Sequence, residues 1–227
     1  MIPEIGNISL MLALSIALVQ SVVPFIGIKK NLPYLMMMAR PCAMTQFILI
    51  VVSFLCLVIA FISNDFSVLY VATNSSESLP FIYRIGATWG GHEGSLLLWL
   101  LMINSWTFLL CLFSKRYPPA LIAQVLAILA MINVGFLLFL LATSNPFLRD
   151  FFQTPLAGQD LNPLLQDPGL LMHPPMLYMG YVGFALVFAF ALAGLISGKV
   201  DREWASFAKP WIILSWASLT LGIVLGS

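Results

Sequence analysis

Six long apolar segments constrain this chain more strongly than any other feature of its sequence. A run of about 20 apolar residues crosses a bilayer as an α-helix, because the helix satisfies its backbone hydrogen bonds within one segment. The segments cover roughly residues 5–28, 42–64, 94–114, 120–143, 175–198 and 210–226. They predict an all-α, polytopic helical membrane protein with about six transmembrane helices, which form a single integral membrane domain over residues 1–227.

The composition supports the same class. Hydrophobic residues make up 61% of the chain and charged residues 8%, whereas a soluble domain usually carries about 25% charged residues. Such a chain cannot cover a surface that faces water, so the lipid bilayer is its expected surrounding. No basic cluster indicates a nucleic-acid partner. Cys42, Cys56 and Cys111 lie in or beside apolar runs without C-x-x-C spacing, which favours buried thiols over a disulfide framework or a zinc site.

The charges of the connections predict the orientation in the membrane. The long second and fourth connections contain only Arg84 and Arg149 as basic residues. The short first, third and fifth connections contain the basic residues Lys29, Lys30, Arg40, Lys115, Arg116, Lys199, Arg202 and Lys209. Short basic loops stay on the cytoplasmic side. We therefore expect both termini and both long loops to face the other side, which is the periplasm for the inner membrane of a bacterium.

No ionisable side chain lies in the middle of any predicted span. The polar residues at this depth are amides and hydroxyls, such as Gln20, Gln46, Asn104, Gln124 and Asn133. Ion pumps and coupled transporters usually need ionisable groups there, so a transporter subunit is disfavoured. The outer loops are left as the expected working parts of the protein.

The first outer loop contains a glycine-rich turn, within the stretch YRIGATWGGHEGSLLLWLLMINSW at residues 83–106. Glycine adopts backbone conformations that other residues avoid and lets another segment approach closely. The residues Gly90, Gly91 and Gly94 therefore predict a tight turn with positive φ values immediately before the third span.

Polar and aromatic side chains follow this turn. His92 and Glu93 begin the third span, where the free N–H groups and partial positive charge of a helix N-terminus suit an anion. Positions 92, 99 and 106 are seven apart, so His92, Trp99 and Trp106 lie on one stripe of the helix. The favoured interpretation of the tryptophans is an aromatic belt at the membrane interface. For His92, a structural hydrogen-bonding role stays slightly ahead of a ligand role.

The second outer loop ends in the motif MHPPM, which contains His173. Pro174 and Pro175 have no N–H to lose at a helix start and their φ is already nearly helical, so they are predicted to begin the fifth span. A residue before proline avoids helical geometry, which predicts an extended His173 on a rigid backbone outside the helix. A neutral imidazole is a common ligand of haem iron, and the apolar neighbours Met172 and Tyr178 could cover a porphyrin face. An interfacial histidine that caps a loop is the alternative.

Two stretches, taken together and in this order, resemble one family. They are ATWGGHEGSLLLW at residues 87–99 and LNPLLQDPGLLMHPPMLYMGYVG at residues 161–183. Both are similar to motifs of the CcmF family of cytochrome c-type biogenesis proteins, the large membrane subunit of the bacterial haem lyase, and the similarity extends over essentially the whole chain. The resemblance implies that haem vinyl groups are joined, at the periplasmic face, to the two thiols of a C-x-x-C-H motif. The implied partners are the haem chaperone CcmE, apocytochrome c and other haem lyase subunits of the CcmH type.

The resemblance also implies roles for individual residues. In the family, the histidine of the H-P-P motif is one of two imidazoles that flank the incoming haem, and this position matches His173. The resemblance therefore implies that haem is the cofactor and that His173 is an axial ligand of its iron. The expected chamber lining around the haem consists of Trp89, His92, Glu93, Trp99, Met172, Pro174 and Pro175.

One part of the family pattern has no counterpart in these 227 residues. The family's Trp-rich segment, of the type W-G-G-W-W-F-W-D, is expected to follow directly after residue 227. The second periplasmic haem-binding histidine and two intramembrane histidines that hold a resident b-type haem belong to that part of the family sequence. The chain therefore resembles an N-terminal part of the family, either as a piece of a longer protein or as one chain of a split one. We do not expect it to complete the lyase reaction alone.

A second function class stays open from the residues themselves. The chain could be a non-catalytic assembly or docking subunit of a respiratory or biogenesis complex, which holds partner subunits through its spans. His173 would then be structural. Haem occupancy of a His173→Ala variant separates the two classes.

Overall fold

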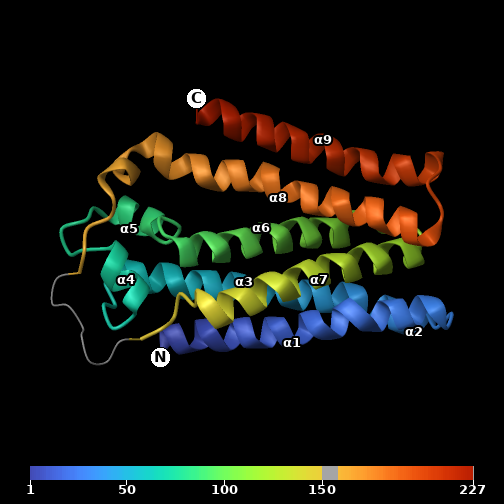
Figure 1. Ribbon diagram of the computed structural model, residues 1–227, viewed down its shortest axis with the longest axis horizontal. Coiled ribbons are helices and arrows are strands. Elements are labelled where there is room, and N and C mark those ends of the chain that lie inside the picture. The colour runs from blue at the N-terminus through green and yellow to red at the C-terminus, as the bar shows by residue number, and fades with distance from the viewer. Residues whose placement is uncertain (150–157, 227) are drawn as a thin grey trace.

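The fold is a bundle of long helices that run roughly parallel to one another (Figure 1). A computed structural model of the chain describes residues 1–149 and 158–226. The long helices are α1 (Ile2–Lys29), α3 (Ala39–Ile62), α6 (His92–Phe113), α7 (Pro119–Thr143), α8 (Pro168–Ser197) and α9 (Arg202–Leu225). By length and apolar composition, six helical spans can each cross a membrane, the second of them including the short helix before α3. The predicted all-α, multi-pass fold is confirmed.

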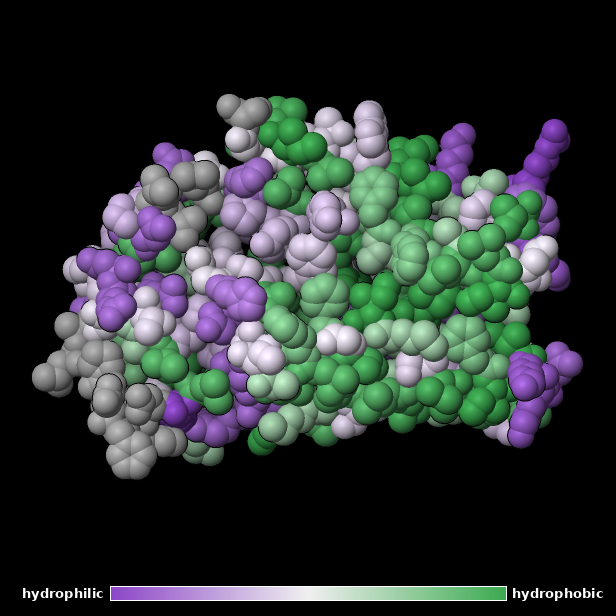
Figure 2. All heavy atoms as spheres, in the orientation of Figure 1, coloured by the Kyte–Doolittle hydropathy of each residue, from purple (hydrophilic) through white to green (hydrophobic). Residues whose placement is uncertain are grey.

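Short helices lie at both ends of the bundle. α2 (Pro33–Met37) precedes α3 at one end. At the other end lie α4 (Leu69–Asn74), α5 (Phe81–Ala87) and the 3-10 helix η1 (Pro163–Gln166), in the two long connections. Both termini lie at this second end (Figure 1), so an even number of spans separates them. Figure 2 shows hydrophilic residues gathered at the two ends and a largely hydrophobic middle, as a bilayer-spanning protein requires.

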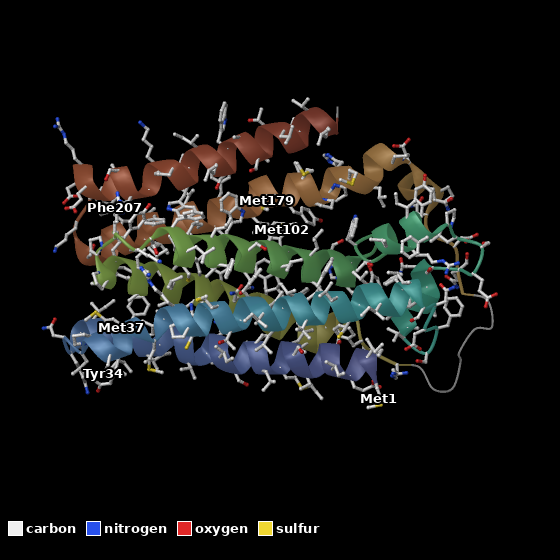
Figure 3. All side chains as sticks on the ribbon, turned by 180° about the vertical axis from the view of Figure 1, so that it is seen from behind. Met1, Tyr34, Met37, Met102, Met179 and Phe207 are labelled. Carbon is white, nitrogen blue, oxygen red and sulfur yellow. The ribbon has the colours of Figure 1, made fainter. Side chains whose placement is uncertain are left out.

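Two apolar clusters fill the bundle, one in each half of its length. The first joins α1, α3, α6 and the end of α7 around Leu10, Phe61 and Leu97. The second joins α6, α7, α8 and α9 around Ile103 and Phe190. In Figure 3, Met102 of α6 and Met179 of α8 lie between these two helices, and both residues pack against the second cluster. Helices in lipid associate through close packing, because lipid tails are as apolar as the side chains.

The helices α8 and α9 form a hairpin that packs backbone against backbone. α8 ends at Ser197, and the next residue, Gly198, has a φ of +65°, a conformation that favours glycine. A Cβ added to Gly180 would lie 2.1 Å from the backbone nitrogen of Leu219, and one added to Gly222 would lie 2.6 Å from Cα of Leu177. Only glycine permits this approach, so the hairpin depends on small residues as membrane helix pairs commonly do.

A chain of buried amides crosses the middle of the bundle. Gln46 donates to the side-chain oxygen of Gln20, and Gln20 donates to the carbonyl of Leu126 at 2.9 Å. Asn133 donates to the side-chain oxygen of Gln46 at 3.3 Å, and Asn133 and Asn104 exchange amide bonds of 3.3 and 3.4 Å. Four of the amides predicted at this depth, Gln20, Gln46, Asn104 and Asn133, are therefore paired across α1, α3, α6 and α7, which satisfies polar groups that lipid could not solvate.

The fifth and sixth spans begin earlier than the apolar runs indicate. α8 begins at Pro168 where residue 175 was predicted, and α9 begins at Arg202 where residue 210 was predicted. Each start follows an aspartate: Asp167 accepts a bond from the N–H of Gly169 at 2.7 Å, and Asp201 accepts one from the N–H of Trp204 at 2.8 Å. Carboxylate caps start helices whatever the hydropathy of the residues that follow. In α9 the first turn contains the charged residues Arg202 and Glu203, which hydropathy does not recognise. In α8 the predicted start was placed at the later prolines, Pro174 and Pro175.

The two long connections pack against each other at the end that holds the termini. The N–H of Leu69 donates to the carbonyl of Leu148 at 2.9 Å, and the N–H of Gln159 donates to the carbonyl of Ala72 at 2.8 Å. The fourth connection therefore lies along both ends of α4.

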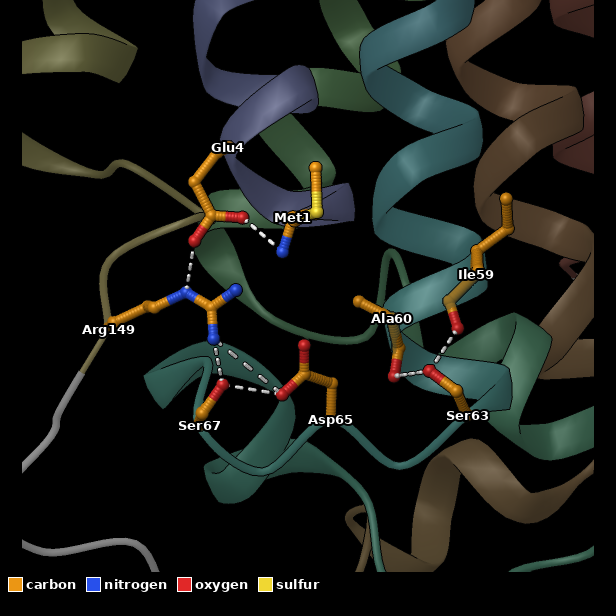
Figure 4. A network of polar contacts seen from close by, with 8 residues as sticks. All are labelled: Met1, Glu4, Ile59, Ala60, Ser63, Asp65, Ser67 and Arg149. Carbon is orange, nitrogen blue, oxygen red and sulfur yellow. Dashed lines mark hydrogen bonds and ion pairs between the residues drawn. The ribbon is translucent and has the colours of Figure 1, made fainter.

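Arg149 ties the fourth connection to two other segments (Figure 4). Its Nε lies 2.7 Å from Glu4 Oε1 in α1, and Glu4 Oε2 lies 2.7 Å from the ammonium group of Met1. The guanidinium also donates to Ser67 and lies 4.0 Å from Asp65 Oδ1. Arg149, one of the two basic residues of the long connections, is thus paired and helps to stabilise the end of the bundle that holds these connections.

Candidate functional site

His173 lies inside α8 and not in an extended segment before it. α8 continues through Pro174 and Pro175, so the predicted extended conformation of His173 is wrong. The helix starts at the Asp167 cap, where the carbonyl of Asp167 also accepts the N–H of Leu171 at 2.9 Å. The avoidance of helical geometry before a proline is a bias that a capped and packed helix overcomes. The rigid support expected from the prolines is therefore a helix.

The imidazole of His173 faces the end of α9. Its Nδ1 lies 3.0 Å from the carbonyl oxygen of Gly222. A carbonyl oxygen only accepts, so Nδ1 carries the proton in this contact and the lone pair of the neutral ring lies on Nε2. The ring is half-buried and lies against Gly226, where an added Cβ would be 2.3 Å from its Cε1. A histidine whose Nδ1–H is held by a backbone carbonyl presents Nε2 to a metal.

The carbonyl that holds His173 is available because α9 ends there. The last carbonyls of a helix have no partner within the helix. In a continuing α-helix the N–H of Gly226 would bond to the carbonyl of Gly222. It bonds instead to the carbonyl of Ile223, at 3.1 Å. The imidazole takes the place of the missing helical donor. The end of α9 is therefore part of the site that positions His173.

Trp89 joins the glycine-rich turn to the first turns of α8. Its indole Nε1 donates to the carbonyl of Leu171 at 3.2 Å. The Leu171 side chain is buried and packs so tightly on α5 that a Cβ added to Gly86 would lie 1.6 Å from its Cδ1. Of the predicted chamber lining, Trp89 is thus the residue whose contact links the first outer loop to the helix of His173.

Tyr70 of α4 organises the glycine-rich turn. The N–H of Gly91 donates to the Tyr70 hydroxyl at 2.9 Å, and this hydroxyl donates to the carbonyl of Thr88 at 3.2 Å. A Cβ added to Gly94 would lie 1.7 Å from the carbonyl oxygen of Thr88. Burial raises the pKa of Tyr70 above its usual range, so the hydroxyl stays protonated and can both donate and accept. No short-range pattern in the sequence indicated this residue.

The predictions about the turn were right in one respect and wrong in another. Its glycines allow close approach, as predicted. Their predicted positive φ values are wrong, because among the described residues the glycines with positive φ are Gly158 and Gly198. The closeness of the segments, and not the left-handed backbone, requires glycine in this turn.

His92 and Glu93 lie at the start of α6, and their place in the predicted chamber lining stays a prediction. His92 is exposed at the start of α6, and its ring meets the ring of Phe139 of α7 edge-on at 6.2 Å between centroids. Glu93 is half-buried at the second position of the helix. Both residues thus lie at the outer end of the bundle, and the described ring contact of His92 is with α7 and not with α8.

The tryptophans of the predicted stripe pack between helices. Trp99 stacks on Phe136 of α7 at 5.7 Å between centroids and meets Tyr178 of α8 edge-on at 5.4 Å. Trp106 is 4% exposed and donates from Nε1 to the carbonyl of Met179 at 2.8 Å. It lies roughly 21 Å along the helix from His92 at 1.5 Å per residue. An interface belt is therefore the wrong interpretation for Trp106, which joins α6 to α8.

The donor set around His173 fits an axial ligand of haem. No group of three or more His, Cys, Asp or Glu that could hold a metal ion occurs among residues 1–149 and 158–226. A porphyrin supplies four nitrogens to its iron, so the protein needs to add only one or two axial ligands. Beside the imidazole, Pro174 and Pro175 are half-buried and Met172 is 57% exposed, which leaves an apolar surface accessible to a flat ligand.

A separate cavity of about 770 Å³ lies at the opposite end of the bundle. Its lining includes Lys29, Pro118 and Lys199, at the ends of α1 and α8 and the start of α7. These helix ends are those farthest from the two long connections. The cavity is therefore not part of the site around His173.

Comparison with known proteins assigns a family. A family model described as cytochrome C assembly protein matches residues 89–227. The cytochrome c-type biogenesis protein CcmF of Escherichia coli K12 is 56% identical over 227 residues, which are 100% of this chain and 35% of that protein. CcmF of Pseudomonas aeruginosa PAO1 is 54% identical with the same coverage, 100% and 35%.

A solved structure supports the same assignment. The protein named Cytochrome c Heme Lyase CcmF superposes with a TM-score of 0.82 at 25% identity, over 98% of this chain and 35% of that one. The chain thus spans about a third of the length of these relatives, 35% in each case.

Proposed function

Because the chain belongs to the cytochrome C assembly protein family, we propose that it forms part of a membrane haem lyase that matures cytochrome c. In this role His173 binds the iron of haem through Nε2 while the haem is joined to apocytochrome c. The observation that carries the proposal is the contact of His173 Nδ1 with the carbonyl of Gly222 at 3.0 Å, which leaves Nε2 as the coordinating atom.

The reaction needs positioning and no nucleophile from this chain. Each thiol of the C-x-x-C-H motif adds across a haem vinyl group: a bond forms between sulfur and the inner vinyl carbon, and the thiol hydrogen ends on the outer carbon. Atoms and electrons balance without an oxidant. Bringing haem and thiols into a reactive geometry accounts for a large part of the activation barrier, so a site that holds them in place lowers that barrier. The contribution of His173 is to fix the haem plane at the outer surface of the bundle.

The distribution of charge supports a membrane orientation for the end of the bundle that contains His173. The connections rich in Lys and Arg lie at the end opposite the two long connections, which supports an orientation with α4, α5 and both termini in the periplasm. The protein then spans the inner membrane of a bacterium. The proposed partners are the haem chaperone CcmE, apocytochrome c, subunits of the CcmH type and the remaining part of the family sequence, which would hold the resident b-type haem.

The test compares two histidine variants in the complete protein. His173→Ala is expected to lose haem at the outer site, measured by the absorption spectrum of the purified protein and by haem content per chain. His92→Ala is the matched control, because this exposed histidine faces α7 and not α9. Circular dichroism checks that both variants are folded.

Two outcomes would contradict the proposal. Unchanged haem content in His173→Ala would refute ligation by this residue. If the same variant lost its partner subunits while its haem content stayed intact, the chain would instead be a docking subunit. Recovery of the low-spin spectrum on adding free imidazole to His173→Ala would support ligation directly.

A further inference from the structure

The first turns of α8 contain a defect that the sequence creates. In an α-helix the N–H of each residue bonds to the carbonyl four residues earlier. Pro175 has no N–H, so the carbonyl of Leu171 has no donor within the helix. This carbonyl lies two residues before His173. A partly buried carbonyl without a donor is costly, and it loosens the helix that supports the imidazole.

The indole of Trp89 supplies the missing donor. Its Nε1 donates to the carbonyl of Leu171 at 3.2 Å, across 82 residues of sequence. The Leu171 side chain packs on Gly86 in α5 immediately beside this bond. The start of α8 is therefore held at two adjacent points by the segment that carries Trp89.

The backbone of Trp89 is itself held on both sides. Its N–H donates to the carbonyl of Gly86 at 3.1 Å, and its carbonyl accepts the hydroxyl of Ser95 at 3.0 Å. Two residues later, the N–H of Gly91 is bound by Tyr70. The indole is thus presented from a fixed turn, and it loses little conformational entropy on making the bond.

We propose that Trp89 is a positioning residue for His173. Its N–H replaces the helical hydrogen bond that Pro175 removes, and it thereby fixes the α8 backbone from which the imidazole projects toward the haem iron. The end of α9 holds the other side of the same imidazole through Gly222. The inference rests on the proposed function, because it assigns Trp89 a role in haem ligation by His173.

The test uses a substitution that removes the N–H and keeps an aromatic ring. Trp89→Phe in the complete protein is expected to speed amide hydrogen exchange in peptides that cover residues 168–177 about tenfold, the effect of one lost bond and a stranded carbonyl. Haem affinity is expected to fall about fivefold to tenfold, and free imidazole is expected to restore the low-spin spectrum. Trp216→Phe is the matched control, because Trp216 is 61% exposed on α9.

A compensating variant makes the test specific. Pro175→Ala returns an N–H to the position from which a helix bonds the carbonyl of Leu171. The double variant Trp89→Phe/Pro175→Ala is therefore expected to recover the slow exchange and the low-spin spectrum that Trp89→Phe loses. If the double variant exchanges as fast as Trp89→Phe, or if Trp89→Phe behaves like Trp216→Phe, the inference is wrong.

The outcomes separate this inference from the proposed function. If His173→Ala leaves the haem spectrum unchanged, ligation by His173 fails whatever Trp89 does. If His173→Ala loses haem and Trp89→Phe does not weaken it, ligation stands and the role of Trp89 fails. Faster exchange in Trp89→Phe with an unchanged haem spectrum would assign the bond to helix stability alone and would also overturn the positioning role.

Discussion

Gly226 offers a way to displace the imidazole of His173 without changing the imidazole itself. A Cβ at position 226 would lie 2.3 Å from Cε1 and 2.4 Å from Nδ1 of His173. Ordinary contacts begin near 3.4 Å, so the ring must move by about 1 Å or more. Gly226 itself has a φ of −102°, which alanine adopts without strain. Gly226→Ala therefore acts on the ring and not on the backbone.

The size of the effect follows from two contributions. Moving the ring breaks the bond between Nδ1 and the carbonyl of Gly222, which contributes about 1 kcal/mol. It also forces the side chain from its preferred rotamer, at a cost of about 1 kcal/mol. Together they weaken haem binding by about 2 kcal/mol, which is roughly a 30-fold increase in Kd.

The assay is a haem titration of the complete protein, followed by the Soret band. Gly135→Ala is the control, because a Cβ added to Gly135 has no atom within 4 Å. The global fold of both variants should be unchanged, since the clash at position 226 involves the end of a flexible side chain. A Kd for Gly226→Ala equal to that of Gly135→Ala would show that the bond to Gly222 does not orient the ligand.

Three further predictions concern the stability of the bundle and of the glycine-rich turn. Tyr70→Phe should destabilise the glycine-rich turn by about 1–3 kcal/mol, because a buried hydroxyl that bonds three backbone groups is lost; thermal unfolding in detergent measures it. Burial raises the pKa of Tyr70 in the folded state, so as the pH rises the unfolded state loses the hydroxyl proton at a lower pH than the folded state does. The contribution of the Tyr70 hydroxyl to stability is therefore present below about pH 10 and declines above it. The melting temperature of the wild type should therefore fall more steeply above pH 10 than that of Tyr70→Phe, and parallel curves would contradict this. Asn133→Leu should cost about 1–2 kcal/mol in detergent unfolding, because it removes the amide that links Gln46 to Asn104, and an unchanged unfolding curve would show that these bonds contribute nothing.

Much of the fold could be predicted because its dominant signal is local. Whether a segment crosses a bilayer depends on its own length and apolar content, so the six spans were recognisable one by one. Helix starts were less accessible where the first turn is polar. The pair Asp167 and Pro168 carries a cap and a proline at the first helical position, which is a valid start signal. The later pair Pro174 and Pro175 carries a competing proline signal, and only the packed structure decides between the two.

In the candidate site, too, residues with a local sequence signal could be predicted, and residues whose partners lie far along the chain could not. His173 was identified from its own motif and by family resemblance, and its role as a haem ligand stays a proposal. The grouping of His92 and Glu93 with it stays a prediction, because the described ring contact of His92 is with Phe139 of α7. Tyr70 was missed because its partners lie in a turn that begins 17 residues later, at a separation that no short-range pattern covers.

The sequence by itself determined that this chain lies in a membrane and how many times it can cross it, because hydropathy belongs to each segment alone. The H-P-P motif and the family resemblance made the imidazole of His173 the proposed haem ligand. Only the tertiary structure decided how that imidazole is held. The bonds that hold it join residues 82 positions apart, Trp89 to Leu171, and 49 positions apart, His173 to Gly222. Each of these bonds uses a carbonyl that its own helix leaves unpaired, one beside a proline and one at a helix end. Which donor reaches such a carbonyl depends on how the helices pack, and no local pattern contains that information.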